Sequence, residues 1–385
     1  MSFLFEYIDI NPKETIIRGC LAKKIPMDKL QPFCRDIPEY ETSEFNGGSK
    51  FRNGDTIMAR ITPCLENGKT AMVNILDSNE VGFGSTEYIV FRAKKNLTTP
   101  DFVYYLICSS LVRDPAIKSM VGSSGRQRVQ TDVIANLDID FPKLSDQVKI
   151  AGVLKSLDDK IALNNAINNN LEQQAQAIFS NEFLTLEALP DGWKQASLID
   201  IADYLNGLAM QKYRPTADET GIPVLKIKEL RQGCCDDNSE LCSPNIKSEY
   251  IIHDGDVIFS WSGSLLVDFW CGGICGLNQH LFKVTSNKYD KWFYYAWTKH
   301  HLDRFIAVAA DKATTMGHIK RDELSKAEVL IPNEADYKRI GALLQPIYDL
   351  IIANRIENKK LAETRNTLLP KLMSGEIDIS EVDYE

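Results

Sequence analysis

Apolar residues between Asp146 and Phe179 recur at alternating intervals of four and three, the spacing of a coiled-coil seam. We therefore expect one long helix, whose seam contains Ile150, Leu154, Leu157, Ile161, Asn164, Asn168 and Leu171. A second stripe with the same spacing follows 190 residues later, and its two asparagines occupy the same two steps. It contains Ile340, Leu344, Ile347, Ile351, Asn354, Asn358 and Leu361.

Two copies of one seam predict that the two helices pack against each other. Each buried Leu or Ile contributes roughly 1.5–3 kcal/mol. A buried Asn costs stability but selects register, because only another polar group satisfies its amide. The long segment between the helices favours an antiparallel pair, and a rod of about 30 residues at 1.5 Å each is ~45 Å long. The alternative is that each helix packs only on its own globular neighbour.

The segments that precede the helices predict two mixed α/β domains that repeat one plan. Gly54-Asp55 before the predicted strand Thr56–Ile61 is echoed by Gly255-Asp256 before Val257. Further strands are expected at Thr15–Ile17, Thr70–Ile75 and Tyr88–Ala93, and a helix at Asp101–Val112. The predicted organisation is a first domain at 1–142, a central helix at 143–184, a second domain at 185–332, and a distal helix and tail at 333–385. The expected fold class is α+β with an internal pseudo-twofold repeat.

Charge and cysteine content narrow the function classes. The net charge of −9 argues against a protein that holds nucleic acid by bulk electrostatics, so DNA contact would need local patches or basic partners. The nine cysteines are odd in number and scattered, which is typical of a reducing compartment. Because no apolar run of membrane-spanning length and no signal pattern is present, we expect a cytoplasmic protein without membrane contact.

We find no catalytic constellation in the sequence. It contains neither the glycine-rich phosphate loop of ATP-binding proteins nor the Pro-Pro-aromatic loop of DNA amino-methyltransferases. A zinc site built from Cys271, Cys275 and His280, with Cys234, Cys235 and Cys242 as further ligands, is an alternative. Its spacing lacks the duplicated Cys pairing of four-coordinate sites, so buried thiols are the simpler interpretation.

Four motifs, taken in order and with their duplication, indicate a family. They are Pro190-Asp191-Gly192-Trp193, Gly255-Asp256-Val257-Ile258, the run Asp146–Ala151 leading to Leu157–Ile161, and the closing run Thr367–Ile377. The chain resembles the DNA specificity subunit of type I restriction-modification enzymes over essentially its whole length. The first domain departs from the pattern, because it lacks the Pro-x-Gly-Trp opening.

The resemblance implies two target-recognition domains, each reading one half of a split, asymmetric site in double-stranded DNA. Two antiparallel helices would set the gap and dock two modification methyltransferase subunits, and restriction motor-nuclease subunits would join for cleavage. The partners would bind S-adenosylmethionine and ATP with Mg²⁺, whereas this non-catalytic chain would bind no cofactor and no metal. The assembled complex would methylate adenine and cleave DNA.

Candidate DNA contacts fall into two groups. The loop Gly122–Arg128, with Arg126, Gln127 and Arg128, and its equivalent at 312–320, with Thr314, His318 and Lys320, are predicted to contact the DNA backbone. Base readers are expected where the domains differ: Arg60, Thr62, Lys69, Ser85 and Thr86 in the first, and Tyr213, Arg214, Trp261, Ser262, Asn278, Gln279 and His280 in the second.

Two simpler interpretations stay open at this point. The loop at Gly122–Arg128 could be a solvated basic turn, and Trp261 could belong to the core. The acidic balance also leaves a different class of function open, a two-headed coiled-coil scaffold that binds proteins and not DNA. A stand-alone enzyme with a zinc site ranks last.

Overall fold

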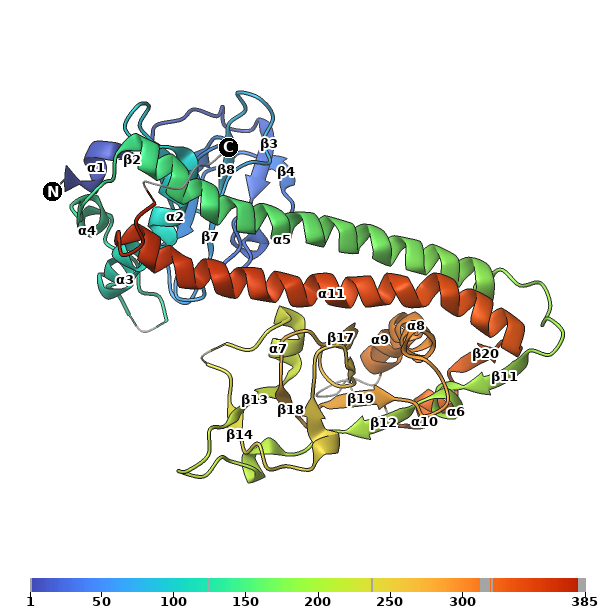
Figure 1. Ribbon diagram of the computed structural model, residues 1–385. Coiled ribbons are helices and arrows are strands. Elements are labelled where there is room, and N and C mark those ends of the chain that lie inside the picture. The colour runs from blue at the N-terminus through green and yellow to red at the C-terminus, as the bar shows by residue number, and fades with distance from the viewer. Residues whose placement is uncertain (1, 124, 237, 312–318, 320, 380–385) are drawn as a thin grey trace. The chain divides into compact units, whose positions relative to one another are not determined.

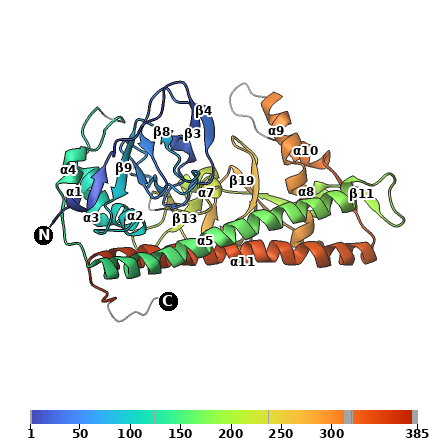
Figure 2. The same ribbon diagram turned by 90° about the horizontal axis from the view of Figure 1, so that it is seen from above.

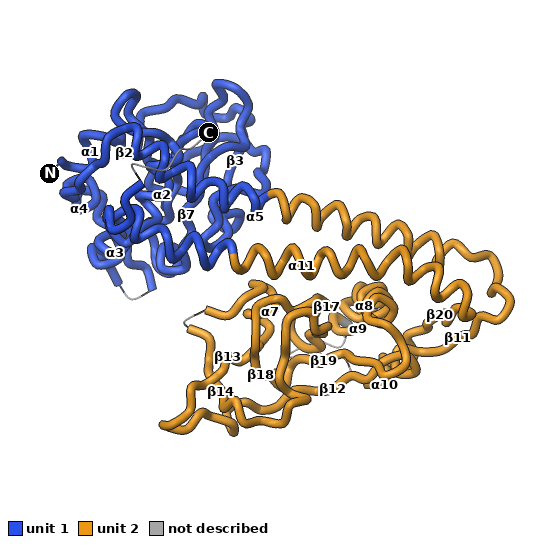
Figure 3. Tube along the Cα trace, in the orientation of Figure 1, with its two compact units in different colours: residues 1–162, 361–385 blue, residues 163–360 orange. Residues whose placement is uncertain are grey.

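The computed structural model describes residues 2–123, 125–236, 238–311, 319 and 321–379. The chain forms two compact units (Figure 3): Met1–Ala162 with Leu361–Glu385, and Leu163–Lys360. Both boundaries between the units lie inside the long helices, whereas the predicted domains end where those helices begin. Each unit therefore consists of one globular domain together with part of each long helix.

The globular part of the first unit contains two four-stranded sheets and one strand pair. The sheets have the orders β2-β9-β6-β7 and β4-β3-β8-β5, and β1 pairs with β10. All pairings are antiparallel except that of β3 with β8. The strands are β1 Ser2–Phe3, β2 Ile8–Ile10, β3 Leu21–Ile25, β4 Glu41–Glu44, β5 Lys50–Phe51, β6 Thr56–Ala59, β7 Thr70–Met72, β8 Gly82–Gly84, β9 Tyr88–Ala93 and β10 Asp138–Ile139. The strand expected at Thr15–Ile17 is wrong, since these residues lie outside any strand.

The helices of this domain are α1 Leu4–Tyr7, α2 Pro100–Cys108, α3 Ser110–Lys118 and α4 Thr131–Ala135. Thr99 caps α2 by accepting a hydrogen bond from the Phe102 amide at 3.2 Å, and Pro100 fits the first turn. The single helix expected at Asp101–Val112 is instead two helices. Ser109 adopts an extended conformation between them, and its hydroxyl donates to the Leu106 carbonyl oxygen at 2.7 Å.

The second unit repeats the same topology. Its sheets have the orders β12-β19-β16-β17 and β14-β13-β18-β15, and β11 pairs with β20. These strand orders are those of the first unit with ten added to each strand number. The strands are β11 Lys194–Ser197, β12 Asp203–Asn206, β13 Ile222–Leu225, β14 Leu241–Cys242, β15 Ile251–Ile252, β16 Val257–Ser260, β17 Leu266–Phe269, β18 Cys275–Leu277, β19 Leu281–Thr285 and β20 Glu328–Ile331. The helices are α6 Leu198–Ile201, α7 Ile227–Gln232, α8 Lys291–His300, α9 Leu302–Asp311 and α10 Arg321–Ser325.

The Gly-Asp turns that open the central strands are structural in both domains. Asp55 accepts a hydrogen bond from the Arg52 amide at 2.7 Å, and Asp256 accepts one from the His253 amide at 2.9 Å. Gly54 and Gly255 adopt φ values of +87° and +84°, which a residue with a side chain rarely takes. The turn signal seen in the sequence thus fixes where β6 and β16 begin.

The long helices are α5, Leu144–Phe179, which continues as a π-helical turn at Ser180–Leu184, and α11, Glu334–Met373. Within the second unit they lie side by side and antiparallel (Figures 1 and 2), with Asn354 bonded to Asn168 and Asn164 bonded to Asn358. All fourteen residues named for the two seams are buried or half-buried. The predicted fold class is confirmed.

Each globular domain also packs on both helices of its own unit. In the first, the Tyr105 hydroxyl donates to Asp158 Oδ2 at 2.7 Å, and Arg365 Nη1 donates to Asp158 Oδ1 at 2.5 Å. In the second, Arg355 of α11 pairs with Glu172 of α5 at 2.9 Å and with Asp268 of β17 at 2.6 Å. The helices therefore pack both on each other and on the domains. Among the described residues, no helix has the length and apolar character needed to cross a bilayer.

Candidate nucleic-acid interface

The two domains share one backbone framework at the end of their central strand. In the first, Arg60 follows β6, its amide donates to the Glu87 carbonyl at 2.9 Å, and its own carbonyl accepts from the Val129 amide at 2.9 Å. In the second, Trp261 follows β16, and its carbonyl accepts from the Ile319 amide at 3.0 Å. Val129 directly follows the first predicted backbone-contact loop, and Ile319 lies near the end of the second, at 312–320. The loops therefore return to equivalent places, although Thr314, His318 and Lys320 themselves lie outside the described residues.

A carboxylate organises the first domain's framework. Arg128 donates to Glu87 from Nε at 3.0 Å and from Nη2 at 2.7 Å, and Arg60 Nε lies 3.5 Å from Glu87 Oε2. The hydrogen bonds from Arg128 lower the pKa of Glu87, with the positive charges of both arginines adding to the effect. Glu87 is thus ionised at neutral pH and sits between two guanidinium groups.

The structure brings most of the other predicted residues of the first domain to the same place. The Thr62 amide donates to the Gln127 carbonyl at 3.0 Å, and Ser85 Oγ accepts from the Glu87 amide at 3.1 Å. Thr86 and Arg126 are exposed beside them. Lys69 is engaged differently, because its ammonium group donates to the Met27 carbonyl at 2.8 Å. All of these residues remain predictions as DNA contacts.

In the second domain the turn after β18 corresponds to the turn after β8. Ser262 Oγ lies 3.1 Å from His280 Nδ1, and Gln279 Nε2 lies 3.3 Å from His280 Nε2. Asn278 and Ser262 are both 5% exposed. Asn278 also accepts a hydrogen bond from the His280 amide at 3.3 Å, which closes the turn. The predicted residues of this turn therefore form one connected polar group.

Trp261 was left open by the sequence as either a base reader or a core residue, and its surroundings have features of both a core and a surface position. Its ring stacks on Phe282 with centroids 5.6 Å apart, while its indole N–H donates to Asn206 Oδ1 at 3.0 Å. The residue is half-buried, so one part belongs to the core and another part reaches the surface. Tyr213 and Arg214 lie apart from this group beside β14, where the Tyr213 carbonyl accepts from the Ser243 amide and Arg214 approaches Glu240 to 3.9 Å.

Sequence reasoning missed Glu87 and Asn206. Glu87 was recoverable, because it stands three residues after Gly84 at the end of β8, as His280 stands three residues after Leu277 at the end of β18. A match between the two β-turns would have selected it along with His280. Asn206 carries no local signal, since it is brought to Trp261 only by the pairing of β12 with β19.

The cysteines considered for zinc do not gather around one point in the described part of the chain. Cys235 and Cys275 approach each other to 3.4 Å between sulfur atoms, and His280 contacts Ser262 and Gln279 instead. No group of three or more His, Cys, Asp or Glu side chains suited to a metal occurs among the described residues. The zinc alternative therefore gains no geometric support.

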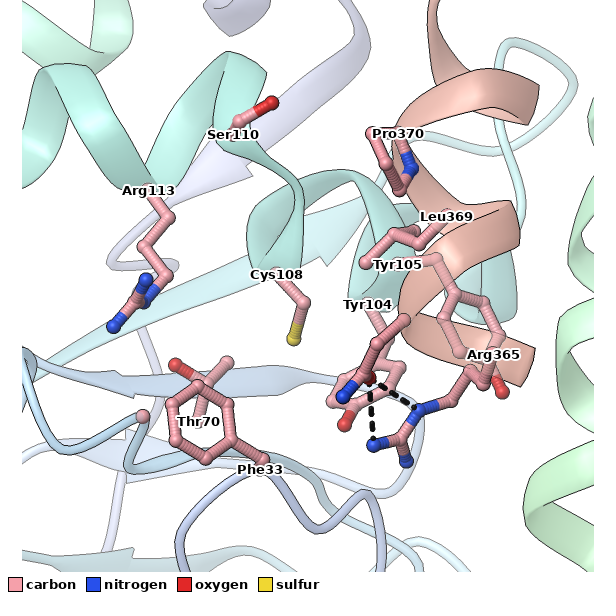
Figure 4. Close-up of a pocket in the computed structure, with 12 residues that line it drawn as sticks. Phe33, Thr70, Tyr104, Tyr105, Cys108, Ser110, Arg113, Arg365, Leu369 and Pro370 are labelled. Atoms are coloured by element: carbon pink, nitrogen blue, oxygen red, sulfur yellow. Dashed lines mark hydrogen bonds between the residues drawn. The ribbon is translucent and has the colours of Figure 1, made fainter. Parts of the chain in front are cut away.

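A pocket of ≈ 270 Å³ lies within the first unit, between α2, α3 and the C-terminal part of α11 (Figure 4). The Cys108 thiol points into it between Arg113 and Arg365. Burial raises the pKa of Cys108 to about 12, so the thiol stays protonated at neutral pH and is a poor nucleophile. Arg113 is held by the Glu66 carbonyl at 2.9 Å and lies over the Phe33 ring. None of the predicted DNA contacts lines this pocket.

A comparison with known protein families identifies the family to which this chain belongs. The family described as the type I restriction modification DNA specificity domain matches residues 32–173 and 190–363. The chain belongs to this family. The two matched segments of the specificity-domain family correspond to the two repeated halves, and membership supports a role in DNA recognition.

Relatives and solved structures agree with this assignment. The type I restriction enzyme MjaIX specificity subunit of Methanocaldococcus jannaschii is 25% identical over 313 residues, which cover 75% of this chain and 71% of that protein. The HindI specificity subunit of Haemophilus influenzae is 21% identical over 404 residues, covering 85% and 87%. The crystal structure of a type I restriction-modification S subunit from M. genitalium aligns with a TM-score of 0.56 at 14% identity, over 96% of this chain and 95% of that one. The last likeness shows that the fold is shared.

Proposed function

We propose that this chain is the DNA-recognition subunit of a type I restriction-modification enzyme. Each globular domain reads one half of a bipartite, asymmetric target in double-stranded DNA, and the paired helices set the gap between the halves. The chain itself performs no catalysis and binds neither S-adenosylmethionine nor ATP.

One observation carries this proposal. The two domains have the same strand order and the same loop-to-strand hydrogen bond, yet they present different side chains on it. Arg60 and Glu87 in the first domain correspond to Trp261 and His280 in the second. A fixed backbone with exchanged side chains is what two readers of two different base sequences need, because base edges are distinguished by donor and acceptor patterns.

The helices supply the surface for the partners in this proposal. Leu163 and Ile167 of α5 and Leu343 and Leu350 of α11 are exposed, although the seam residues of the same helices are buried. Exposed apolar side chains on these helices are the candidates for a docking surface in this proposal. We propose that two methyltransferase subunits dock there, and that they and the motor-nuclease subunits supply S-adenosylmethionine and ATP with Mg²⁺.

A two-headed scaffold that binds proteins is the second candidate, and the net charge of −9 favours it. The local charge at the framework weakens this argument. Arg60, Arg126 and Arg128 outnumber Glu87 and Glu66, whose carboxylate accepts a hydrogen bond from Thr62 at 3.0 Å, so the framework carries a net positive charge despite the acidic balance of the whole chain.

Selection of binding sites from random DNA duplexes tests the proposal. The chain, assembled with its methyltransferase subunits, is expected to enrich a motif of two specified parts around an unspecified gap. Gln279→Ala is expected to relax bases in one part only, since this side chain belongs to one domain. Enrichment of no motif, with the assembly intact, would support the scaffold instead.

A further inference from the structure

The recognition framework of the first domain holds an acidic side chain that the second domain lacks. Resting on the function proposed above, we propose that Glu87 is a specificity-determining residue and that, together with Arg60, it recognises one G·C base pair from the major groove. Arg128 is the positioning residue that fixes the orientation of the Glu87 carboxylate.

The donors and acceptors of the three side chains are divided in a way that suits this role. Arg128 approaches Glu87 with Nε and Nη2 and thereby fixes the plane of the carboxylate. Arg60 approaches Glu87 through Nε at 3.5 Å, and among the described residues this Nε has no hydrogen-bond partner, so the Arg60 guanidinium is not held by Glu87 as firmly as that of Arg128 is. The Arg60 side chain is 34% exposed and that of Glu87 is 24% exposed, so both can reach a ligand.

The backbone under these side chains is well fixed. Besides the bonds of Arg60 to Glu87 and Val129, Arg128 exchanges two backbone hydrogen bonds with Val121, at 2.9 and 3.0 Å. The loop bearing Arg128 is therefore tied both to α3's outgoing chain and to the end of β6. A reader of base edges needs such support, because displacement by a fraction of an ångström weakens directional hydrogen bonds.

A neighbouring arginine and carboxylate complement a G·C pair more closely than an A·T pair. Guanine presents O6 and N7 as adjacent acceptors, which match two guanidinium donors, and cytosine presents the N4 amino group as a donor, which matches a carboxylate oxygen. Adenine instead places the N6 donor beside N7, and thymine offers an acceptor and a methyl group. Opposite an A·T pair, one N–H of the Arg60 guanidinium would face the N6 amino donor of adenine, and the Glu87 carboxylate would face the O4 acceptor of thymine.

Two other roles for Glu87, phosphate binding and a purely structural ion pair, account for the arrangement of these side chains less well. A site built only for phosphate would gain nothing from a carboxylate, which repels the DNA backbone. The ion pair with Arg128 fixes the loop, but that role alone does not account for the second arginine, Arg60, which lies 3.5 Å from the same carboxylate. The fold does not require an acid at this position either, since His280 occupies it in the second domain.

The test compares the wild-type chain with Glu87→Gln by selection from random duplexes, each assembled with the methyltransferase subunits. Glu80→Gln is the matched control, because Glu80 lies in the same domain, is 25% exposed and pairs with Lys23 at 3.1 Å. The wild type is expected to specify a G·C pair in one half-site. Glu87→Gln should reduce discrimination at that single position, by less than the about 5- to 150-fold expected for loss of a bidentate base contact, because Glu87 accepts one hydrogen bond from cytosine N4. Glu80→Gln should leave the motif unchanged.

Loss of a repelling charge gives a second expected signature. Glu87→Gln should bind non-target duplex more tightly than the wild type does, although it discriminates less at the affected base pair. Arg60→Lys, which keeps the charge and loses the fork, should relax the same position.

The outcomes separate this inference from the proposed function. A split motif whose specificity is unaltered by Glu87→Gln and Arg60→Lys, or one altered at an A·T pair, overturns the role of Glu87 and leaves the recognition function standing. Absence of any split motif for the wild-type assembly contradicts the recognition function itself, and this inference with it.

Discussion

Asn354 donates from Nδ2 to Asn168 Oδ1 at 2.9 Å between two buried side chains of α11 and α5. A second bond of the same kind is present, because Asn164 Nδ2 donates to Asn358 Oδ1, also at 2.9 Å. Asn164 and Asn354 are equivalent positions of the repeat, as are Asn168 and Asn358. The matched asparagines of the two seams therefore bond across the repeat, each to the partner that an antiparallel pair brings opposite to it.

Replacement of one member of this pair should cost more than replacement of both. Asn168→Leu leaves the Asn354 amide buried without its partner, which costs about 1–3 kcal/mol of the free energy of unfolding. The double variant with Leu at both positions should recover most of that loss, since no polar group is left unsatisfied. Urea unfolding of the four combinations measures the coupling. Additive effects of the two single changes would show that the amides do not depend on each other.

Asp158 and Arg365 form a buried pair that should be strongly coupled. Their side chains are 5% and 10% exposed, and Asp158 also accepts from Tyr105. Asp158→Ala leaves the guanidinium buried without a counter-ion and should destabilise the chain by about 3–5 kcal/mol. Exposed Glu334, paired with Lys338, supplies the control, because Glu334→Gln should cost less than about 1 kcal/mol. Equal losses for the two variants in urea unfolding would contradict the difference in burial.

Stability should fall between pH 7 and pH 5 because of a buried histidine. Burial lowers the pKa of His301 to about 4, and its Nε2 donates to the Glu328 carbonyl at 2.7 Å. Below its ordinary pKa of about 6.5 the unfolded chain takes up the proton and the folded chain does not, so folding loses about 2 kcal/mol by pH 5.

His301→Gln should remove most of this pH dependence, and the remainder should belong to His300, whose pKa burial also lowers. The measurement is the free energy of unfolding at both pH values for the wild type and the variant. An equally steep decline in His301→Gln would assign the effect to other groups.

Arg126 should contribute charge without contributing sequence preference. It is exposed in the loop that returns to the end of β6, whereas Arg128 in the same loop is held by Glu87. Arg126→Ala should weaken binding to all duplexes and lower the slope of log affinity against log salt by about 1. Lys338→Ala, on the exposed face of α11, is the control. If Arg126→Ala leaves the slope unaltered, the loop does not contact phosphate.

The parts of the fold that the sequence could predict are those with periodic or duplicated signals. The seams repeat at 3.5 residues, and the spacing of 190 between them exposes the repeat. The break at Ser109 was not predicted, because the apolar pattern continues from α2 into α3. Only the serine hydroxyl marks the end of α2. Strands of two residues, such as β1 and β5, are too short to carry an alternation.

For the candidate site, the sequence could predict the separate loops but not that they lie together. The residues at the end of β6, the turn after β8 and the loop before Val129 are far apart in sequence, and strand pairing alone brings them together. Arg365 lies four residues after Leu361, at the spacing of the second seam, and the sequence does not explain its charge because its partner Asp158 lies just outside the first seam.

Lengthening both helices together tests the central claim most directly. Seven residues, one heptad that preserves the seam, are inserted after Ala162 in α5 and after Lys360 in α11, the last residue before the unit boundary along each helix. At 1.5 Å per residue the pair grows by about 10.5 Å, which corresponds to about 3 base pairs of duplex at 3.4 Å each. Mapping of methylated adenines in DNA exposed to the assembled enzyme should then show both half-sites with unchanged bases and a gap about 3 base pairs longer. An unchanged gap, or altered bases in either half, would contradict the claim that the helices set the spacing and the domains read the sequence.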